Sequence, residues 1–327
     1  MAKIAVVNSY GSFLSVKDGR FQLKRGGEIL WDLAPTELEA IVFTVDGASI
    51  STAAVKLANH FFIDLVFLDG SKPIARLIQA RYSPSFKTWI KQVKAYRRRV
   101  ELAKLFIEGK IHNQRMVLSD YAKRLRAQYK PNYDLESSIN EMINLESKVL
   151  ECRDVDEVRG IEALAARYYW RHVAEIIPGS LGFTVRIPRS RKPPVGDIDP
   201  FNKALNIGYS ALLREVWRAV FIAGLNPYVG FLHKPKAGKM VLVFDLMEEF
   251  RPIAVDRPLI NLARRNVDVL LKLREDNVEA VKEVWRTVVK HMMEGNPSIQ
   301  SIILEQARKL ARHVRGGEEY KPFKARW

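Results

Sequence analysis

The hydrophobic residues of this chain change their spacing once. They alternate in short runs up to about residue 75 and recur at helical intervals from Phe86 onward. Alternation is typical of strands, whereas three- and four-residue spacing is typical of helices. Strands followed by helices favour an α+β arrangement in two parts. We therefore predict a small N-terminal β-rich domain at 1–75, a linker at 76–85 and a larger all-α catalytic domain at 86–327.

The first part contains short apolar runs separated by turn residues. The predicted strands are Ile4–Val7, Ser12–Val16, Phe21–Leu23, Ile29–Trp31, Ala40–Thr44 and Ile63–Leu68. Asp18-Gly19 and Gly26-Gly27 predict two hairpin turns. Residues 1–80 hold eight basic and eight acidic residues, without clustered histidines or paired acids. We expect a scaffolding or dimerisation role for this part rather than chemistry.

The net positive charge of the chain lies entirely in its second part. The net charge is +16, and residues 81–130 contain fourteen basic residues against three acidic ones. A basic helix face with few acids indicates binding to a phosphate backbone through counterion release. A membrane-surface helix is disfavoured because the opposite face, with Trp89, Val93 and Tyr96, has a core pattern. The residues assigned to DNA contact are Lys91, Lys94, Arg98, Arg191 and Lys192, the last two in a proline-rich loop.

Several protein classes are excluded by what the sequence does not contain. The single cysteine, Cys152, allows neither an intrachain disulfide nor a Cys-rich zinc site. There is no Walker A loop, no dinucleotide-binding glycine pattern and no apolar run of about 20 residues that could cross a membrane. The start MAKIAVVN predicts a strand rather than a signal peptide. We expect a cytoplasmic protein without a membrane partner.

A histidine and a group of acids lie close together in the segment 230–257. Met240–Phe250 predicts a short amphipathic helix with Asp245, Glu248 and Glu249 on its polar side, and His233 precedes it on a turn. An imidazole with several carboxylates indicates a metal site. The alternative is an acidic face open to solvent, balanced by nearby arginines, with a structural histidine. Periodicity alone leaves both glutamates possible as ligands.

Four blocks of the sequence resemble, in order, the CRISPR-associated endonuclease/integrase family of spacer acquisition. The blocks are GIEALAARYYW at 160–170, RKPPVGDIDPFNKALNIGYSALL at 191–213, GLNPYVGFLH at 224–233, and DLMEEFRP at 245–252 followed by VDR at 255–257. The resemblance extends to the tail motif YKPF. We expect the whole tail, GGEEYKPFKARW at 316–327, to be mobile because it is short, basic and partly aromatic. The sequence departs from the family at Ala163, where a glycine is common.

The resemblance implies the residues of the active site. It assigns Glu162, His233 and Glu248 as ligands of Mg²⁺ or Mn²⁺, with Asp245 in a supporting role. The assignment of Glu162 as a ligand depends on the resemblance alone. Gly160 predicts a helix start, and an acid in the first turn of a helix is favoured whether or not it binds a metal. The resemblance also selects Glu248 over Glu249.

The implied function is a metal-dependent DNA endonuclease/integrase that inserts short foreign DNA into a CRISPR repeat array by phosphodiester transesterification. Its implied partners are double-stranded DNA, a second copy of the chain joined through the N-terminal part, and a small CRISPR-associated subunit. Two other hypotheses remain open at this point. One is a non-catalytic basic DNA-binding scaffold, and the other is a helical metalloenzyme that acts on a small acidic substrate.

Overall fold

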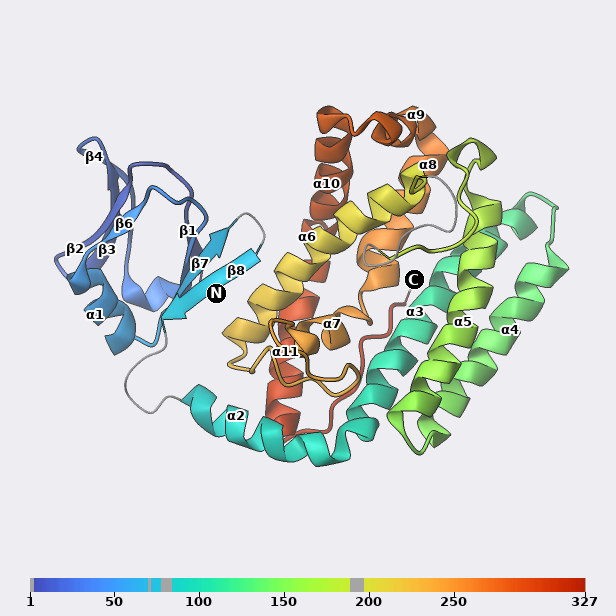
Figure 1. Cartoon of the computed structure of the whole chain (residues 1–327), viewed down its shortest axis with the longest axis horizontal. Helices are drawn as coiled ribbons and strands as arrows, with labels where there is room; N and C mark the ends of the chain where they lie inside the picture. The colour runs from blue at the N-terminus through green and yellow to red at the C-terminus, as the bar shows by residue number, and fades with distance from the viewer. Residues whose placement is uncertain (1–2, 70–71, 78–83, 189–196, 327) are drawn as a thin grey trace. The chain divides into compact units, whose positions relative to one another are not determined.

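A computed structural model describes residues 3–69, 72–77, 84–188 and 197–326. The chain divides into two compact units, Met1–Phe86 and Lys87–Trp327. Strands make up most of the first unit and helices make up the second, as Figure 1 shows. The α+β prediction is therefore confirmed.

The first unit contains two four-stranded sheets and one α-helix. The elements are β1 (Lys3–Val7), β2 (Phe13–Lys17), β3 (Arg20–Arg25), β4 (Glu28–Leu33), β5 (Leu38–Phe43), β6 (Ser49–Ile50), α1 (Thr52–His60), β7 (Asp64–Asp69) and β8 (Lys72–Leu77). One sheet has the order β1-β5-β7-β8 and the other β4-β3-β2-β6. In the first sheet β1, β5 and β7 are parallel, and β8 runs antiparallel to β7.

Both predicted hairpin turns are present. Asp18 and Gly19 have φ angles of 50° and 72°, which is the backbone of a two-residue turn between β2 and β3. Gly26 and Gly27 have φ angles of 56° and 90° and join β3 to β4. β8 was not predicted, and together with α2, which begins at Pro84, it overlaps the expected linker at 76–85.

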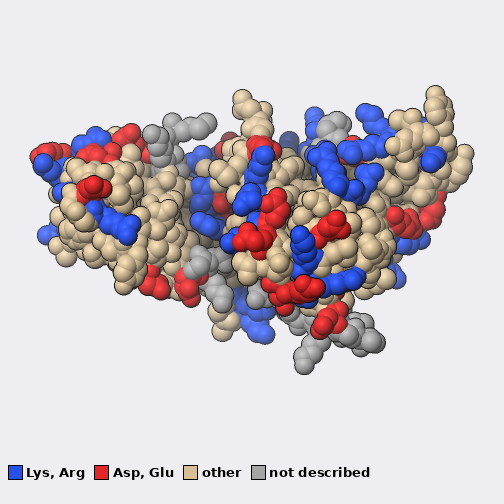
Figure 2. All heavy atoms as spheres, turned by 90° about the horizontal axis from the view of Figure 1, so that it is seen from above, with Lys and Arg blue, Asp and Glu red and all other residues tan. Residues whose placement is uncertain are grey.

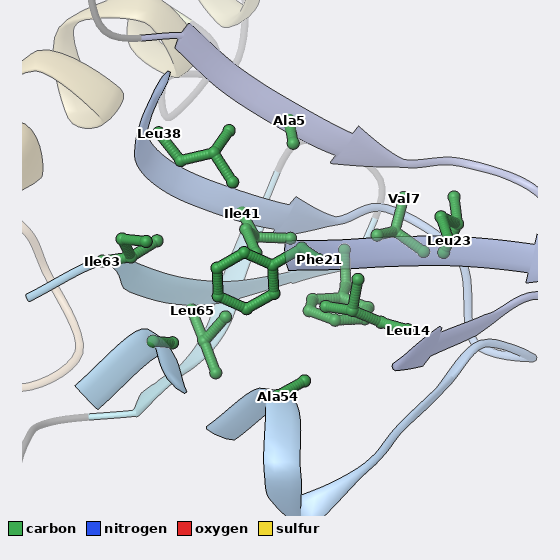
Figure 3. Packing of buried hydrophobic residues seen from close by; sticks show 12 residues of the cluster. Ala5, Val7, Leu14, Phe21, Leu23, Leu38, Ile41, Ala54, Ile63 and Leu65 are labelled. Atoms are coloured by element: carbon green, nitrogen blue, oxygen red, sulfur yellow. The ribbon is translucent and has the colours of Figure 1, made fainter. Parts of the chain in front are cut away.

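The core of the first unit lies where strands of both sheets and α1 meet. Figure 3 shows the side chains of Leu14, Phe21, Ile41 and Leu65 pointing toward one another, and all four are 2% exposed or less. Ala54 of α1 is also fully buried against them. Burial of apolar side chains of this size stabilises a fold by about 1.5–3 kcal/mol each.

The second unit contains ten α-helices among its described residues. They are α2 (Pro84–Ala95), α3 (Arg99–Ala127), α4 (Tyr133–Lys148), α5 (Val155–Ile176), α6 (Pro200–Ile222), α7 (Val241–Met247), α8 (Arg257–Arg265), α9 (Val267–Leu271), α10 (Val278–Met293) and α11 (Ile299–Val314). In Figure 1, α3, α4 and α5 lie side by side, and α6 packs against α10 and α11. No helix in the described ranges is long and apolar enough to cross a membrane.

The predicted helix start at Gly160 is wrong, and this changes the interpretation of Glu162. Asp154 is the N-cap of α5 and accepts hydrogen bonds from the backbone N–H groups of Asp156 and Glu157. Gly160 therefore lies inside α5 and does not start a helix. Glu162 is in the interior of α5, two turns after the cap, so a first-turn preference does not explain this acid.

The predicted apolar face of the first basic helix is also interrupted. A 3₁₀ turn at Tyr96–Arg98 separates α2 from α3 and changes the direction in which side chains point. Val93 is 57% exposed, and Phe86 and Ile90 are exposed as well. The expectation that α2 lacks exposed large hydrophobic residues is therefore wrong.

The C-terminal tail is packed rather than mobile. Figure 1 shows it as an extended segment beside α3. Tyr320 is 1% exposed and Ala325 is 4% exposed. Gly109 of α3 makes this approach possible, because a Cβ atom there would lie 2.9 Å from Cβ of Pro322.

Candidate active site

Asp245 holds His233 in one orientation. Its carboxylate is fully buried in α7 and accepts hydrogen bonds from the backbone N–H groups of Leu232 and His233, each at 3.0 Å. Asp245 Oδ1 also lies 2.6 Å from His233 Nδ1. An Nδ1–H that donates to a carboxylate leaves Nε2 with the lone pair that a metal ligand needs.

The turn that carries His233 depends on a glycine and an arginine. A Cβ atom at Gly230 would lie 2.6 Å from Asp245 Oδ2, so a larger residue would displace the carboxylate. Arg159 of α5 donates a 2.8 Å hydrogen bond to the backbone carbonyl of Leu232. Because Arg159 and Glu162 are three residues apart on α5, the contact brings the face that carries Glu162 to the His233 turn.

Glu162 and Glu248 meet at one cation. Lys110 Nζ lies 2.5 Å from Glu162 Oε1 and 2.7 Å from Glu248 Oε2. The three side chains come from α5, from the turn that follows α7, and from α3. The other oxygen of Glu248 lies 3.0 Å from Arg251 Nε. The side chain of Glu248 is 6% exposed and that of Lys110 is 11% exposed, so these charges are largely removed from water.

The charges of this group change one another's pKa values. Burial alone would lower the pKa of His233, but the hydrogen bond and charge of Asp245, with the charges of Glu248 and Glu162, raise it above its usual value. Burial alone would raise the pKa of Glu248, but the charges of Arg251 and Lys110 outweigh it and lower the pKa to about 2. Glu248 is therefore ionised at neutral pH, as a metal ligand must be.

Glu249 has a different environment from Glu248. It is fully buried and accepts hydrogen bonds from the Tyr320 hydroxyl at 2.5 Å, the Phe323 backbone N–H at 2.7 Å and Gln306 Nε2 at 3.2 Å. Asn113 of α3 donates to the carbonyls of both Glu249 and Phe323. Glu249 therefore anchors the C-terminal tail.

The alternative of an acidic face open to solvent is wrong. Asp245 and Glu249 are fully buried and Glu248 is 4% exposed. The helix ends at Met247, and the chain continues through a turn into a π-helix at Arg251–Asp256. The three acids therefore meet different partners: the His233 turn, the Lys110 cation and the tail.

The donor types of Glu162, Glu248 and His233 suit a divalent metal ion, although their ligand atoms are not a group within 4.8 Å of one another. The carboxylates of Glu162 and Glu248 converge on the Lys110 ammonium. Both carboxylates are close enough to His233 for their charges to raise the pKa of its imidazole. Carboxylate oxygens suit Mg²⁺ and Mn²⁺, and an imidazole nitrogen favours Mn²⁺.

A second group of acids and a histidine was not predicted. Within the described part of the chain, the metal-ligand atoms of Asp134, His172 and Glu175 lie within 4.8 Å of one another. Glu175 meets His172 Nδ1 at 2.8 Å and Asp134 meets Nε2 at 3.9 Å, on opposite sides of the ring. Arg171 also pairs with Asp134 at 2.9 Å. This cluster is a potential metal-binding triad, but its acids already have partners. The three-residue spacing of His172 and Glu175 on α5 was the available signal.

The residues assigned to DNA contact are only partly placed. Lys91, Lys94 and Arg98 are exposed on α2 and the following turn, whereas Arg191 and Lys192 lie outside the described residues. Other basic residues of α3 are neutralised by acids: Arg115 pairs with Glu146, Arg124 with Asp120 and Arg126 with Glu136. On the face shown in Figure 2, acidic side chains likewise lie between the basic ones. The basic surface is less continuous than the sequence indicated.

Lys110 and Arg251 are the functional candidates that the sequence did not single out. Both are basic residues in a strongly basic unit, so their composition gives no signal. Their role depends on contacts with Glu248, which lies 138 residues after Lys110 along the chain.

Comparison with known proteins identifies close relatives. Residues 5–292 match the family described as CRISPR associated protein Cas1. The chain is 43% identical over 326 residues to CRISPR-associated endonuclease Cas1 1 of Saccharolobus solfataricus, covering 99% of this chain and 84% of the relative. It is 31% identical to CRISPR-associated endonuclease Cas1 1 of Archaeoglobus fulgidus, covering 98% of this chain and 99% of the relative.

Solved structures share the fold. A casposase bound to an integration product has a TM-score of 0.74 at 22% identity and covers 98% of both chains. A CAS1 protein from Thermotoga maritima has a TM-score of 0.64 at 19% identity, covering 98% of this chain and 100% of the other. A partial Cas6-RT-Cas1–Cas2 complex has a TM-score of 0.74 at 18% identity and covers 100% of both chains.

Proposed function

The chain belongs to the Cas1 family of CRISPR-associated proteins, and on this basis we propose that it is a DNA endonuclease and integrase that inserts short DNA fragments into a CRISPR repeat array. The relatives named CRISPR-associated endonuclease support the nuclease activity. The casposase whose structure contains an integration product supports strand transfer on the same fold.

Glu162, His233 and Glu248 are the proposed ligands of one Mg²⁺ or Mn²⁺ ion. When bound, such an ion polarises a phosphoryl oxygen and activates the attacking hydroxyl, which is water in hydrolysis or a DNA 3′ end in integration. Arg251 stays beside Glu248 and limits the negative charge that Glu162 and Glu248 would otherwise concentrate.

Asp245 is the proposed positioning residue. It does not reach the reacting atoms in this proposal, because its two oxygens are engaged by the Phe231–His233 backbone and by the His233 ring. It fixes the tautomer and direction of that ring, so that Nε2 remains the nitrogen that binds.

The proposed partners follow the relatives and the charge of the second unit. We propose that duplex DNA contacts Lys91, Lys94 and Arg98, which are exposed, and that Arg191 and Lys192 also take part. The complex of a Cas1 with a Cas2 supports a small partner subunit of that kind. We also propose a homodimer formed through the first unit, acting in the cytoplasm.

One observation carries the proposal: the buried Glu248 and the half-buried Glu162 converge on one cation beside a histidine that Asp245 fixes. The test is nicking of a labelled, branched DNA with and without Mn²⁺. His233→Ala should abolish Mn²⁺-dependent nicking and leave DNA affinity nearly unchanged, because the basic side chains of α2 are separate from the site. Retained nicking by a folded variant would contradict the assignment.

A matched pair separates the two adjacent glutamates. Glu248→Gln should remove nearly all Mn²⁺-dependent nicking, whereas Glu249→Gln should nick at close to the wild-type rate because Glu249 faces the tail. If the Glu249 variant loses more nicking than the Glu248 variant, the ligand assignment is wrong.

The nicking assay and the salt dependence of substrate affinity each separate the proposal from one of the two other function classes. A DNA-binding scaffold would bind duplex DNA without any Mn²⁺-dependent cleavage. An enzyme for a small acidic substrate would show a weak salt dependence, whereas long phosphate contacts lose affinity steeply with salt.

A further inference from the structure

Lys110 lies where the proposed metal ion would have to bind. Its ammonium nitrogen is 2.5 Å from Glu162 Oε1 and 2.7 Å from Glu248 Oε2, and its side chain is 11% exposed. The contact with Glu162 is a charge-assisted hydrogen bond, and the contact with Glu248 is an ion pair without hydrogen-bond geometry. The ammonium of Lys110 therefore already joins two of the three proposed ligands.

A divalent ion and the Lys110 ammonium cannot both contact these two oxygens without strong repulsion. An ion bound to the Glu248 oxygen at about 2.1 Å would lie within about 5 Å of the ammonium nitrogen. Because the side chains of Lys110 and Glu248 are only 11% and 6% exposed, a doubly charged ion and an ammonium so close repel each other with reduced screening.

Arg251 and Lys110 contact different oxygens of Glu248. Arg251 contacts only Oε1 of Glu248, which is the oxygen that Lys110 does not contact. Its guanidinium also lies over the ring of Tyr209, 4.7 Å from the centroid, which holds it to one side. Arg251 therefore leaves Glu248 Oε2 free for an ion, whereas Lys110 occupies it.

We propose that Lys110 is an internal competitor of the metal ion: it neutralises Glu162 and Glu248 in the metal-free enzyme, and Mg²⁺ or Mn²⁺ must displace it to bind. The inference rests on the proposed function, since it takes Glu162 and Glu248 as ligands. It gives the metal-free site a built-in counter-ion, so that the carboxylates of Glu162 and Glu248 stay together without a bound ion.

The test is Lys110→Met, which keeps an unbranched side chain of similar length and removes the charge. Mn²⁺ binding, measured by calorimetry without DNA, should become about tenfold tighter or more, because the ion no longer displaces a cation. The unfolding temperature in EDTA should fall, because the two carboxylates lose their counter-ion, and saturating Mn²⁺ should restore it. Unchanged or weaker Mn²⁺ binding by Lys110→Met would overturn the proposal.

Two further variants complete the experiment. Lys104→Met removes the same charge from the same helix, but Lys104 contacts the carbonyl of Leu150 instead, so its Mn²⁺ affinity should equal that of the wild type. Lys110→Arg keeps a charge that pairs well with carboxylates, so it should fold without metal and bind Mn²⁺ no more tightly than the wild type. If Lys110→Met does not fold in EDTA, tighter Mn²⁺ binding by Lys110→Arg would still overturn the proposal.

Mn²⁺ binding by Glu248→Gln and by Lys110→Met distinguishes a wrong set of ligands from a wrong role for Lys110. If Glu248→Gln binds Mn²⁺ as well as the wild type does, the ligand assignment is wrong. If Glu248→Gln loses Mn²⁺ but Lys110→Met behaves like the wild type, the site is correct and Lys110 does not compete.

Discussion

The Tyr320 hydroxyl donates a 2.5 Å hydrogen bond to Glu249, although the two residues are 71 positions apart in the sequence. Glu249 directly follows the proposed ligand Glu248. The C-terminal tail is therefore joined to the segment that carries the ligand.

Tyr320→Phe should lower the free energy of unfolding by about 1–3 kcal/mol, because it leaves a buried carboxylate oxygen without a donor. The ring packing against Phe106 would remain. Urea unfolding measures the effect, and Tyr129→Phe is the control because Tyr129 is 95% exposed. Equal stability of the two variants would show that the bond contributes little.

Asp245→Asn should weaken Mn²⁺ binding by about 10- to 100-fold, because an amide no longer fixes the His233 ring as a carboxylate does. Nicking should fall by an intermediate amount, less than for Glu248→Gln. Calorimetry of Mn²⁺ binding and the nicking assay, performed on the same preparation, check this. A variant with wild-type Mn²⁺ affinity would remove Asp245 from its positioning role.

Reversing Lys91, Lys94 and Arg98 to Glu should weaken binding to all DNA sequences alike. It should also flatten the dependence of log K on log salt by about 0.9 for each phosphate that the variant no longer neutralises. The control reverses Lys282, Arg286 and Lys290 on α10, whose side chains are 58–72% exposed. If the salt slope changes only in the control, DNA binds elsewhere on the second unit.

The tail should loosen in acid through Glu146. Burial alone would raise the pKa of Glu146, but hydrogen bonds from His112 and Lys324 of the tail lower it from 4.5 to about 2. A lowered pKa means that the contribution to stability is complete above pH 4.5 and is lost as the pH falls toward 2. The stability difference between wild type and Glu146→Gln should therefore shrink between pH 5 and about pH 2.5 in urea unfolding. A constant difference would contradict this.

Local sequence signals predicted the fold well where the structure is locally determined. The Asp18-Gly19 and Gly26-Gly27 turns define two hairpins because these residues readily adopt positive φ angles. β8 was missed because Pro73 is disfavoured in most strands. It is nevertheless a strand position here because β8 lies at the edge of its sheet.

The site was harder to predict because its partners are distant in sequence. A helical projection places Asp245, Glu248 and Glu249 on one side of a helix. However, α7 ends at Met247, so the side chains of Glu248 and Glu249 do not follow the helical periodicity. The cation that Glu162 and Glu248 share comes from α3, and no local pattern indicates that contact. The resemblance to a family indicated the proposed ligands, but it did not indicate Lys110.

The packed tail also makes its contacts late in synthesis. Tyr320, Phe323 and Lys324 follow in the chain every group that they contact, including Glu249 and Glu146. Because a nascent chain leaves the ribosome from its N-terminus, the basic residues of α2 emerge more than 200 residues before the donors that hold Glu249. A partly synthesised chain can therefore expose the basic side chains of α2 before Glu249 acquires the donors of the tail.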